Sequence, residues 1–396
     1  MSLRMCTALA VSAACLALTP QPAVAETVYT ITPLVTDSQA ALTAAGFGQA
    51  VTVDPNLINP WGVSLSPTGP FWVSNQGSNT STLYDGDGNP FPIGNPLVVD
   101  IPHAGPPAGP TGQAFVGGTG LKVPSGGDAI FAFANLDGSI SAWTPGTTTA
   151  QVVVPAGTTG TAVYTGLTIT GTGADTRLYA ANHASGRIDV FDSNYQPVST
   201  AGKFVDPGDN PNGLLPFNVK AINGQIYVTY AIPGDSADAA PLGSGFVSVF
   251  DMDGNFVRRF ASDGQLASPW GVALAPDGFG DFSNALLIGN FNEEFGHIGA
   301  YDPTSAAFLG LLADANGTPL TIPYLWEILF GNGTLSDAGD LYFAAGIGDE
   351  QHGLFGEIAA SEAIPEPATF GLIGLGMLAI AARRQTGAAR SVANVA

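Results

Sequence analysis

The chain repeats a short sequence pattern about every 53 residues. The phrase NPWGVSLS begins at residue 59 and returns as SPWGVALA at residue 268, and related phrases begin at residues 109, 163, 215 and 324. Their equivalent positions are Gly62, Gly112, Gly166, Asn218, Gly271 and Glu327. Six units at this spacing indicate a repeat architecture, in which each unit buries its apolar faces only against its neighbours.

A second recurring pattern within the same units indicates how many strands each unit contains. Runs of β-branched and aromatic residues end at Asn75, Asn135, Asn182, Tyr230, Asn290 and Ala345. A polar loop and another strand-like run follow each of them, and Gly and Pro separate the runs. Four short strands in about 53 residues are typical of one propeller blade. We therefore predict an all-β, six-bladed β-propeller over residues 26–360, with no amphipathic helix.

The last unit lacks a fourth strand, because the chain reaches a Pro-Glu-Pro turn soon after Phe355–Ala359. The β-rich stretch VYTITPLV at residues 28–35 belongs to no unit. We predict that this N-terminal strand closes the last blade and removes a free sheet edge.

The N-terminus has the features of a secretory signal peptide spanning residues 1–25. Arg4 precedes an apolar run, and the small residues before Ala25 and Glu26 suggest cleavage between those two. A lipoprotein cleavage at Cys15 is the alternative. Both cysteines lie within this segment, so the mature chain has no thiol or disulfide.

Residues 361–396 form a separate tail with a Pro-Glu-Pro turn, an apolar run at 367–382 and a basic end. As a helix, this run would span roughly 24 Å, less than a bilayer core of about 30 Å. Arginines beyond it belong on the cytoplasmic side, which leaves the propeller outside. The alternative is a plain C-terminal anchor.

Charge excludes some partners. Residues 26–360 contain seven Lys and Arg, since four of the 11 lie outside, and 30 Asp and Glu, since two of the 32 lie outside. The resulting net charge near −23 repels nucleic acid and anionic lipid. Cations and neutral sugars remain possible ligands.

Longer stretches of the sequence resemble two known families. ADTRLYAANHASGRIDVFD at residues 174–192 resembles the repeat of NHL-type propellers, and nearly all of residues 28–360 resembles a family of uncharacterised exported bacterial propellers. This resemblance implies export and a propeller but no activity. The tail resembles the PEP-CTERM sorting signal through Pro365, Glu366, Pro367, Arg383 and Arg384.

The PEP-CTERM resemblance carries several expectations about the fate of the protein. It implies export in a Gram-negative bacterium with transient inner-membrane association through the C-terminal segment. It also implies processing by an exosortase-type enzyme near the Pro-Glu-Pro turn, followed by delivery to the cell surface or extracellular biofilm matrix.

Candidate ligand-binding residues lie where the innermost strands begin, since those positions share one face of a propeller with the loops between second and third strands. This face is expected to collect an aromatic rim with two polar exceptions, which suits a sugar or a cation. The residues are Trp61, Phe217, Trp270, Trp326, Asn218 and Glu327. Alternatively, the rings pack between adjacent blades.

Loops on the same face supply a candidate metal set from adjacent units five and six. Its members are His297, Glu293, Glu294, Asp349, Glu350 and His352. The alternative is ordinary solvated loops. The DGDGN and DMDGN sequences at residues 85 and 251 resemble calcium loops but lack their later ligands, so we predict tight hairpin turns.

The sequence contains no motif for a catalytic nucleophile, zinc protease, P-loop or dinucleotide site. We therefore favour a non-enzymatic binding module for an extracellular polysaccharide or an envelope protein. The alternative is a calcium-dependent lactonase or esterase that uses the central channel. In that case Glu327 and Asn218, with the Asn residues that end second strands, would supply the ligands.

Overall fold

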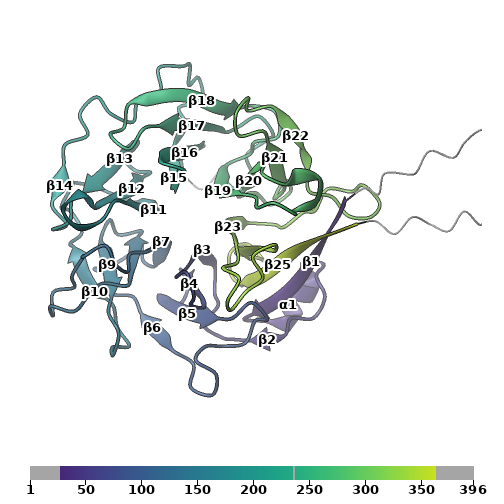
Figure 1. Ribbon diagram of the computed structural model, residues 1–396, viewed down its shortest axis with the longest axis horizontal. Helices are drawn as coiled ribbons and strands as arrows, with labels where there is room; N and C mark the ends of the chain where they lie inside the picture. The colour runs from purple at the N-terminus through teal and green to yellow at the C-terminus, as the bar shows by residue number, and fades with distance from the viewer. Residues whose placement is uncertain (1–26, 235–236, 363–396) are drawn as a thin grey trace, which may run out of the picture. The chain divides into compact units, whose positions relative to one another are not determined.

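The computed structural model describes residues 27–362 except 235 and 236, and Thr27–Ser361 form one compact unit. Its strands form six sheets, each of four strands except one of five. Figure 1 shows the sheets arranged as blades around a central axis, with the first strand of each repeat nearest the centre. The predicted all-β, six-bladed propeller is therefore confirmed.

Blades one to three follow one another along the chain. Blade one contains β3 (Pro60–Leu65), β4 (Phe71–Asn75), β5 (Thr80–Tyr84) and β6 (Val98–Asp100). Blade two contains β7 (Pro110–Phe115), β8 (Phe131–Asn135), β9 (Ile140–Trp143) and β10 (Gln151–Val154). Blade three contains β11 (Tyr164–Thr170), β12 (Arg177–Asn182), β13 (Arg187–Phe191) and β14 (Pro197–Val198).

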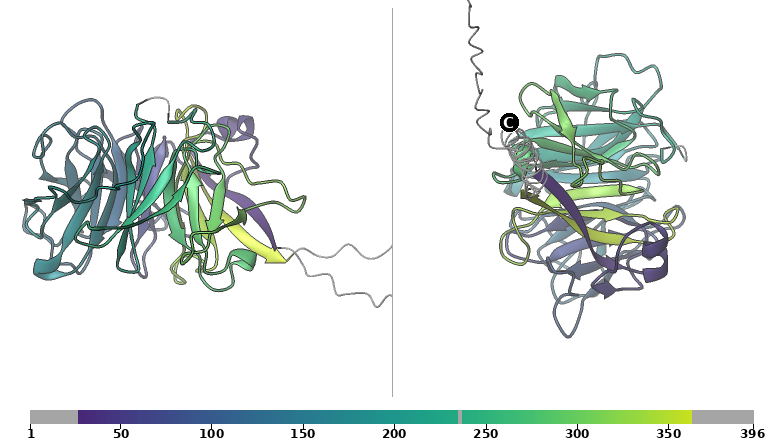
Figure 2. Two further views of the ribbon diagram at one scale, coloured as in Figure 1. Left: turned by 90° about the horizontal axis from the view of Figure 1, so that it is seen from above. Right: turned by 90° about the vertical axis from the view of Figure 1, so that its right-hand side faces the viewer.

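Blades four to six complete the ring, which Figure 2 shows from two further directions. Blade four contains β15 (Leu215–Ile222), β16 (Gln225–Ala231), β17 (Phe246–Phe250) and β18 (Phe256–Ser262). Blade five contains β19 (Pro269–Leu274), β20 (Leu286–Asn290), β21 (Ile298–Tyr301) and β22 (Phe308–Leu311). Blade six contains β23 (Leu325–Phe330), β24 (Leu341–Ala345), β25 (Leu354–Glu362), β1 (Thr27–Thr36) and β2 (Thr52–Val53).

The N-terminal strand β1 closes the ring as predicted, because it lies beside β25 in blade six (Figure 1). Side chains at its end reinforce this pairing. The Thr36 hydroxyl donates to the Gly353 carbonyl at 2.8 Å, and the Asp37 carboxylate accepts from the Gly353 N–H at 2.8 Å. The first and last parts of the propeller are thus bonded directly to each other.

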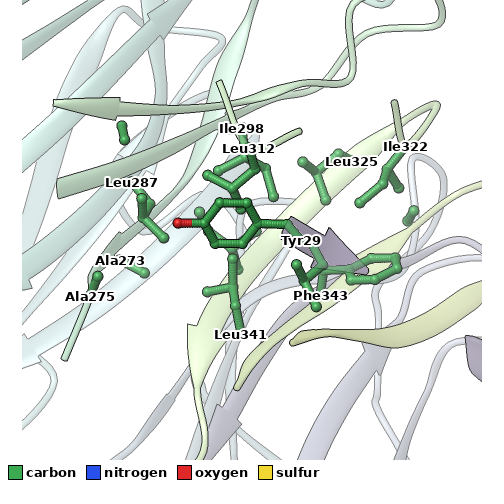
Figure 3. Close-up of a cluster of buried hydrophobic side chains, with 14 of the residues drawn as sticks. Tyr29, Ala273, Ala275, Leu287, Ile298, Leu312, Ile322, Leu325, Leu341 and Phe343 are labelled. Atoms are coloured by element: carbon green, nitrogen blue, oxygen red, sulfur yellow. The ribbon is translucent and has the colours of Figure 1, made fainter. Parts of the chain in front are cut away.

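Strand β1 also contributes to the apolar cores on both sides of blade six. Figure 3 shows Tyr29 among side chains of blades five and six, including Leu287 and Leu341. Further along the strand, Leu34 and Val35 pack in a second cluster with side chains of blade one. Closure therefore rests on buried apolar contacts as well as on strand pairing.

The six equivalent positions of the repeat lie in the innermost strands, each at a β-bulge. A Cβ at Gly112 would lie 2.6 Å from the Gly166 Cα, and one at Gly271 would lie 2.6 Å from the Trp326 carbonyl oxygen. Atoms cannot approach so closely without displacing the backbone. Glycine therefore allows the innermost strands of adjacent blades to meet.

One short helix accompanies the strands in the described residues. Ser38 caps the six-residue helix α1 (Gln39–Ala44) by accepting from the Ala41 N–H at 3.3 Å, and Leu42 is fully buried in the core that contains Tyr29. Six residues are too few for a periodic apolar pattern. Two short 3-10 turns, η1 (Gly173–Asp175) and η2 (Gly280–Phe282), complete the described helical elements.

We predict that Gly112→Ala destabilises the propeller by about 1–3 kcal/mol, because its methyl group would overpack the contact between blades two and three. Gly48→Ala is the matched control, since no atom lies within 4 Å of a Cβ there. Thermal unfolding of the two purified variants measures the difference. Equal melting temperatures would show that the innermost strands do not depend on this close approach.

Candidate functional site

A cavity of about 370 Å³ opens at the end of the channel where the innermost strands begin. Its aromatic lining comes from Trp61, Phe217 and Trp326 at these strand starts, and from Phe291 directly after β20. Loops between second and third strands supply the polar side chains. The volume falls within the range of small-molecule pockets, roughly 300–1,000 Å³.

The aromatic residues pack mainly on one another. The Trp61 and Trp326 rings stack with centroids 3.5 Å apart, and Trp326 also stacks on Phe291 at 3.9 Å. Trp270 meets Trp326 edge-on at 5.7 Å and is fully buried. The expected open rim is therefore a packed cluster that forms the floor of a cavity, and Trp270 lies beneath its surface.

A small residue, Thr165, borders the cavity beside this cluster. In blade three it occupies the position that Trp61 and Phe217 occupy in blades one and four, immediately before the equivalent position of the repeat. Its hydroxyl donates to the Phe217 carbonyl at 2.7 Å, and its small side chain lines the cavity. The floor is thus aromatic on one side and open on the other.

Two carboxylates from different loops line the cavity. Glu350 comes from the β24–β25 loop, and Asp238 comes from the long β16–β17 loop. Asn59 donates to Glu350 Oε1 at 3.0 Å and to Gln76 Oε1 at 2.9 Å. Burial raises the pKa of Glu350, the hydrogen bond from Asn59 opposes the rise, and the charge of Asp238 adds to it.

His183 lines the cavity as a neutral base. Its Nδ1 lies 2.9 Å from the Pro216 carbonyl oxygen, which can only accept, so Nδ1 carries the proton and Nε2 is an acceptor. Burial lowers the pKa of His183, with the hydrogen bond to Pro216 opposing the shift.

Trp61 contributes an unused hydrogen-bond donor. Its side chain is 7% exposed, and its Nε1 is buried without a hydrogen-bond partner among the residues that the structure describes. By contrast, Trp326 donates to Asn59 Oδ1 at 3.3 Å and Trp270 to the Thr165 carbonyl at 3.1 Å. A buried donor without a partner costs about 1–3 kcal/mol, which an acceptor on a ligand would relieve.

Asn218 and Glu327, the two polar exceptions in the repeat, bridge blades and do not line the cavity. Asn218 donates from Nδ2 to the Trp270 carbonyl at 2.9 Å. Glu327 lies 3.0 Å from the Lys220 ammonium, which joins blades six and four across the channel. Burial raises the pKa of Glu327, while the charge and hydrogen bond of Lys220 oppose the rise.

The structure does not bring the six predicted metal ligands together. His352 contacts Asp37 at 2.7 Å, Asp349 accepts from the Tyr324 hydroxyl at 2.8 Å, and Glu293 and Glu294 are exposed. Nε2 of His297 lies 3.1 Å from the Thr321 hydroxyl. Within the described part of the chain, no group of three or more His, Asp or Glu side chains is placed to hold a metal ion.

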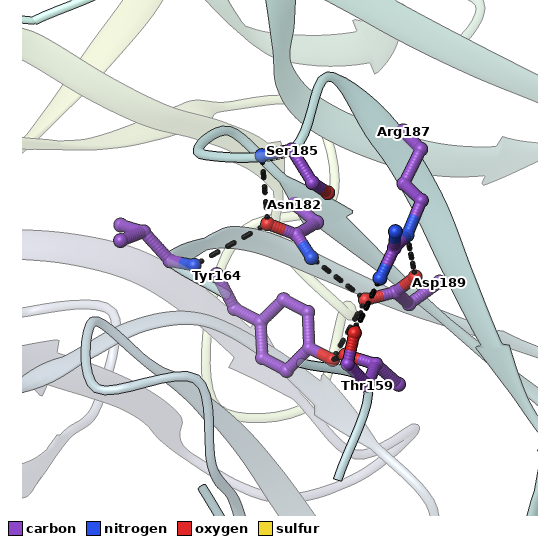
Figure 4. A network of polar contacts seen from close by, with 7 residues as sticks. Thr159, Tyr164, Asn182, Ser185, Arg187 and Asp189 are labelled. Carbon is purple, nitrogen blue, oxygen red and sulfur yellow. Dashed lines mark hydrogen bonds and ion pairs between the residues drawn. The ribbon is translucent and has the colours of Figure 1, made fainter. Parts of the chain in front are cut away.

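The Asn residues that end second strands stabilise hairpins. Figure 4 shows Asn182 donating to Asp189 at 2.8 Å, and Asn75 donates to the Thr80 and Thr82 hydroxyls at 3.1 and 2.9 Å. These amides are therefore engaged within their own blades.

The two calcium-like sequences form tight turns, as predicted. The N–H of Asp85 donates to the Asn89 carbonyl at 3.0 Å, and that of Asp251 donates to the Asn255 carbonyl at 3.0 Å. Gly88 and Gly254 supply the positive φ angles of 80° and 77°.

The fold and site together define a six-bladed β-propeller with an aromatic and acidic pocket at one channel mouth. The chain is 31% identical over 334 residues to uncharacterized protein R648 of Acanthamoeba polyphaga mimivirus, covering 80% of this chain and 78% of the viral one. It is 30% identical over 327 residues to uncharacterized protein L690 of the same virus, covering 80% and 83%. The chain belongs to the family of these proteins.

Residues 363–385 match the PEP-CTERM protein-sorting motif. This motif is processed by exosortase and marks the chain as an exported cell-surface protein. The motif, the predicted signal peptide and the predicted apolar helix at 367–382 lie outside the described residues. Among residues that are described, no helix is long and apolar enough to cross a membrane.

Solved structures show a looser similarity. A virginiamycin B lyase from Staphylococcus aureus is 13% identical with a TM-score of 0.46, and the match covers 84% of this chain and 99% of the lyase. A protein of unknown function from Bacteroides thetaiotaomicron is 10% identical with a TM-score of 0.49, covering 85% and 77%. At these scores we draw no conclusion about activity.

We predict that Glu350→Gln changes how stability depends on pH. Because the pKa of Glu350 is raised above its ordinary 4.5, the folded protein holds this proton more tightly, and its stability falls as pH rises from 4.5 through the raised value. The variant keeps an acceptor for Asn59 but lacks this fall, so it should melt higher than the wild type at neutral pH. Parallel melting curves between pH 4 and 7 would contradict the assignment.

Proposed function

We propose that the protein is an exported surface module that binds carbohydrate in the channel-mouth pocket. The observation that carries this proposal is the combination of an aromatic floor with a buried, unpartnered Trp61 N–H. Aromatic faces bind the apolar C–H faces of sugar rings, and hydroxyl groups satisfy buried donors and acceptors alike.

The polar groups of the pocket match the hydroxyls of a sugar. Glu350, Asp238 and His183 Nε2 can accept hydrogen bonds, whereas the Trp61 N–H needs an acceptor. Hydroxyl groups provide both functions from one ligand. The net charge near −23 also disfavours nucleic acid and anionic membranes as partners.

The contacts of Glu327 and Asn218 support the hydrolase alternative less well than they support a binding role. Its proposed ligands Glu327 and Asn218 are engaged by Lys220 and by the Trp270 carbonyl, and neither lines the cavity. A binding role uses the observed pocket without rearranging these bonds.

The sorting tail supports a more specific fate. We propose export in a Gram-negative bacterium, transient retention in the inner membrane through residues 367–382, exosortase cleavage near Pro365–Pro367 and release to the surface or biofilm matrix. In this account the propeller displays its pocket to extracellular polysaccharide.

Replacing Pro365, Glu366 and Pro367 by alanine should leave folding intact and retain the protein in the inner membrane, because the processing enzyme would lose its recognition turn. Cell fractionation and immunoblotting measure the distribution, with a Gly48→Ala variant as the control for expression. Normal release of the triple variant would indicate that the tail is only an anchor.

Phe217→Leu should weaken saccharide binding about two- to tenfold, since an aromatic contact contributes about 0.5–1.5 kcal/mol beyond area burial. Phe204→Leu is the matched control, because Phe204 is similarly buried, at 8% against 4% exposure, but lies in the core between blades three and four. Titration calorimetry with extracted surface polysaccharide compares them. Equal affinities in both variants, or no binding by the folded wild type, would contradict the proposal.

A further inference from the structure

The channel-mouth pocket contains two acidic side chains and neither Lys nor Arg, and its one histidine, His183, is neutral. None of its lining residues is Lys or Arg, and neither Asp238 nor Glu350 forms an ion pair among the described residues. Lys220, the cation within the channel, is already paired with Glu327. Partly buried carboxylates without a counter-charge favour a ligand that brings a positive charge.

The two carboxylates come from loops of two non-adjacent blades. Asp238 belongs to blade four and Glu350 to blade six, with blade five between them, yet the charge of Asp238 acts on Glu350. A cation between the two loops would be attracted by both. The loop of Asp238 is fixed to the neighbouring loop of blade five, since the Glu293 N–H donates to the Asp238 carbonyl at 2.9 Å.

The aromatic floor favours the same charge. Trp61, Phe217 and Phe291 line the cavity, and aromatic faces carry partial negative charge that attracts ammonium groups. A purely anionic sugar would meet repulsion from both the floor and the carboxylates.

The Trp61 N–H favours a ligand that carries an acceptor as well as a cation. This donor is buried and has no partner among the described residues, so a ligand acceptor placed beside it would satisfy it. A simple polyamine offers only donors. A sugar ring with an amine offers hydroxyl acceptors, an apolar face for the floor and an ammonium for the carboxylates.

From this combination we infer that the pocket binds an amino sugar whose amine is free and protonated. The ring lies against the floor of Trp61 and Phe217, a hydroxyl accepts from Trp61 Nε1, and the ammonium donates to Glu350 and Asp238. The inference rests on the proposed carbohydrate-binding function and specifies the class of sugar.

Three matched trisaccharides test the inference by titration calorimetry on the purified full chain. They are the β-1,4-linked trimers of glucosamine, of N-acetylglucosamine and of glucose, which differ only in the group at one ring position. At about pH 6 the glucosamine trimer carries positive charge, because its amines, like an α-amino group with a pKa of about 7.7, have neighbouring electron-withdrawing groups and are still protonated there. We expect it to bind at least about tenfold more tightly than the other two, through charge-assisted hydrogen bonds.

Four single variants test which side chains cause the preference for the glucosamine trimer. Glu350→Gln and Asp238→Asn should each reduce the preference for the glucosamine trimer and retain the affinity shared by all three. Trp61→Phe should weaken all three, because the aromatic face remains but the donor is lost. Glu294→Gln removes the same charge from an exposed position outside the cavity and should leave the preference unchanged.

The outcomes separate this inference from the proposed function. Equal binding of the three trimers would overturn the amino-sugar inference and preserve carbohydrate binding, whereas no saccharide binding by the folded protein would overturn both. Binding of trilysine in place of glucosamine would also overturn the inference, as would an equal loss of preference in Glu294→Gln and Glu350→Gln.

Discussion

The close approach of innermost strands from adjacent blades determines the rest of this structure. At Gly112 and Gly271 the backbones of neighbouring blades meet without an intervening side chain. Where the repeat departs from glycine, the side chain bonds across the gap, as Asn218 does to Trp270 and Glu327 does to Lys220. The innermost strands of adjacent blades therefore pack closely, and the cavity lies beside the residues at which these strands begin.

The pocket follows from the residue that precedes each of these positions. Blades one, four and six place Trp61, Phe217 and Trp326 there, whereas blade three places the smaller Thr165 beside the same cavity. Longer loops from blades four and six then add Asp238 and Glu350. The residues that recur from blade to blade form the ring of innermost strands, whereas residues that differ between blades line the cavity.

Much of the fold could be predicted because the repeat determines local hydrogen bonding and burial together. Glycine at Gly62, Gly112, Gly166 and Gly271 marked the innermost strands, and the lone β-rich stretch near Tyr29 marked the closing strand. Helix α1 could not be predicted, since its six residues are stabilised by a cap and one buried leucine.

Less of the candidate site than of the fold could be predicted from the sequence. The repeat identified the correct face and three lining aromatics, Trp61, Phe217 and Trp326. It could not show that Trp270 lies beneath them or that Glu327 pairs across the channel, because these contacts join units distant in the chain. Asp238 lies in the long β16–β17 loop, which has no counterpart of equal length in the other units, so the repeat could not align it with them. Phe291 carried one usable signal, its position directly after the strand-ending Asn290.

A crystal structure of the protein with a bound oligosaccharide tests the central claim most directly. Our account predicts a sugar ring in the channel-mouth pocket, packed against Trp61 and Phe217, with an oxygen accepting from Trp61 Nε1 and a polar group facing Glu350. A sugar bound on an outer strand or on the opposite face, with this pocket filled by side chains, would contradict it.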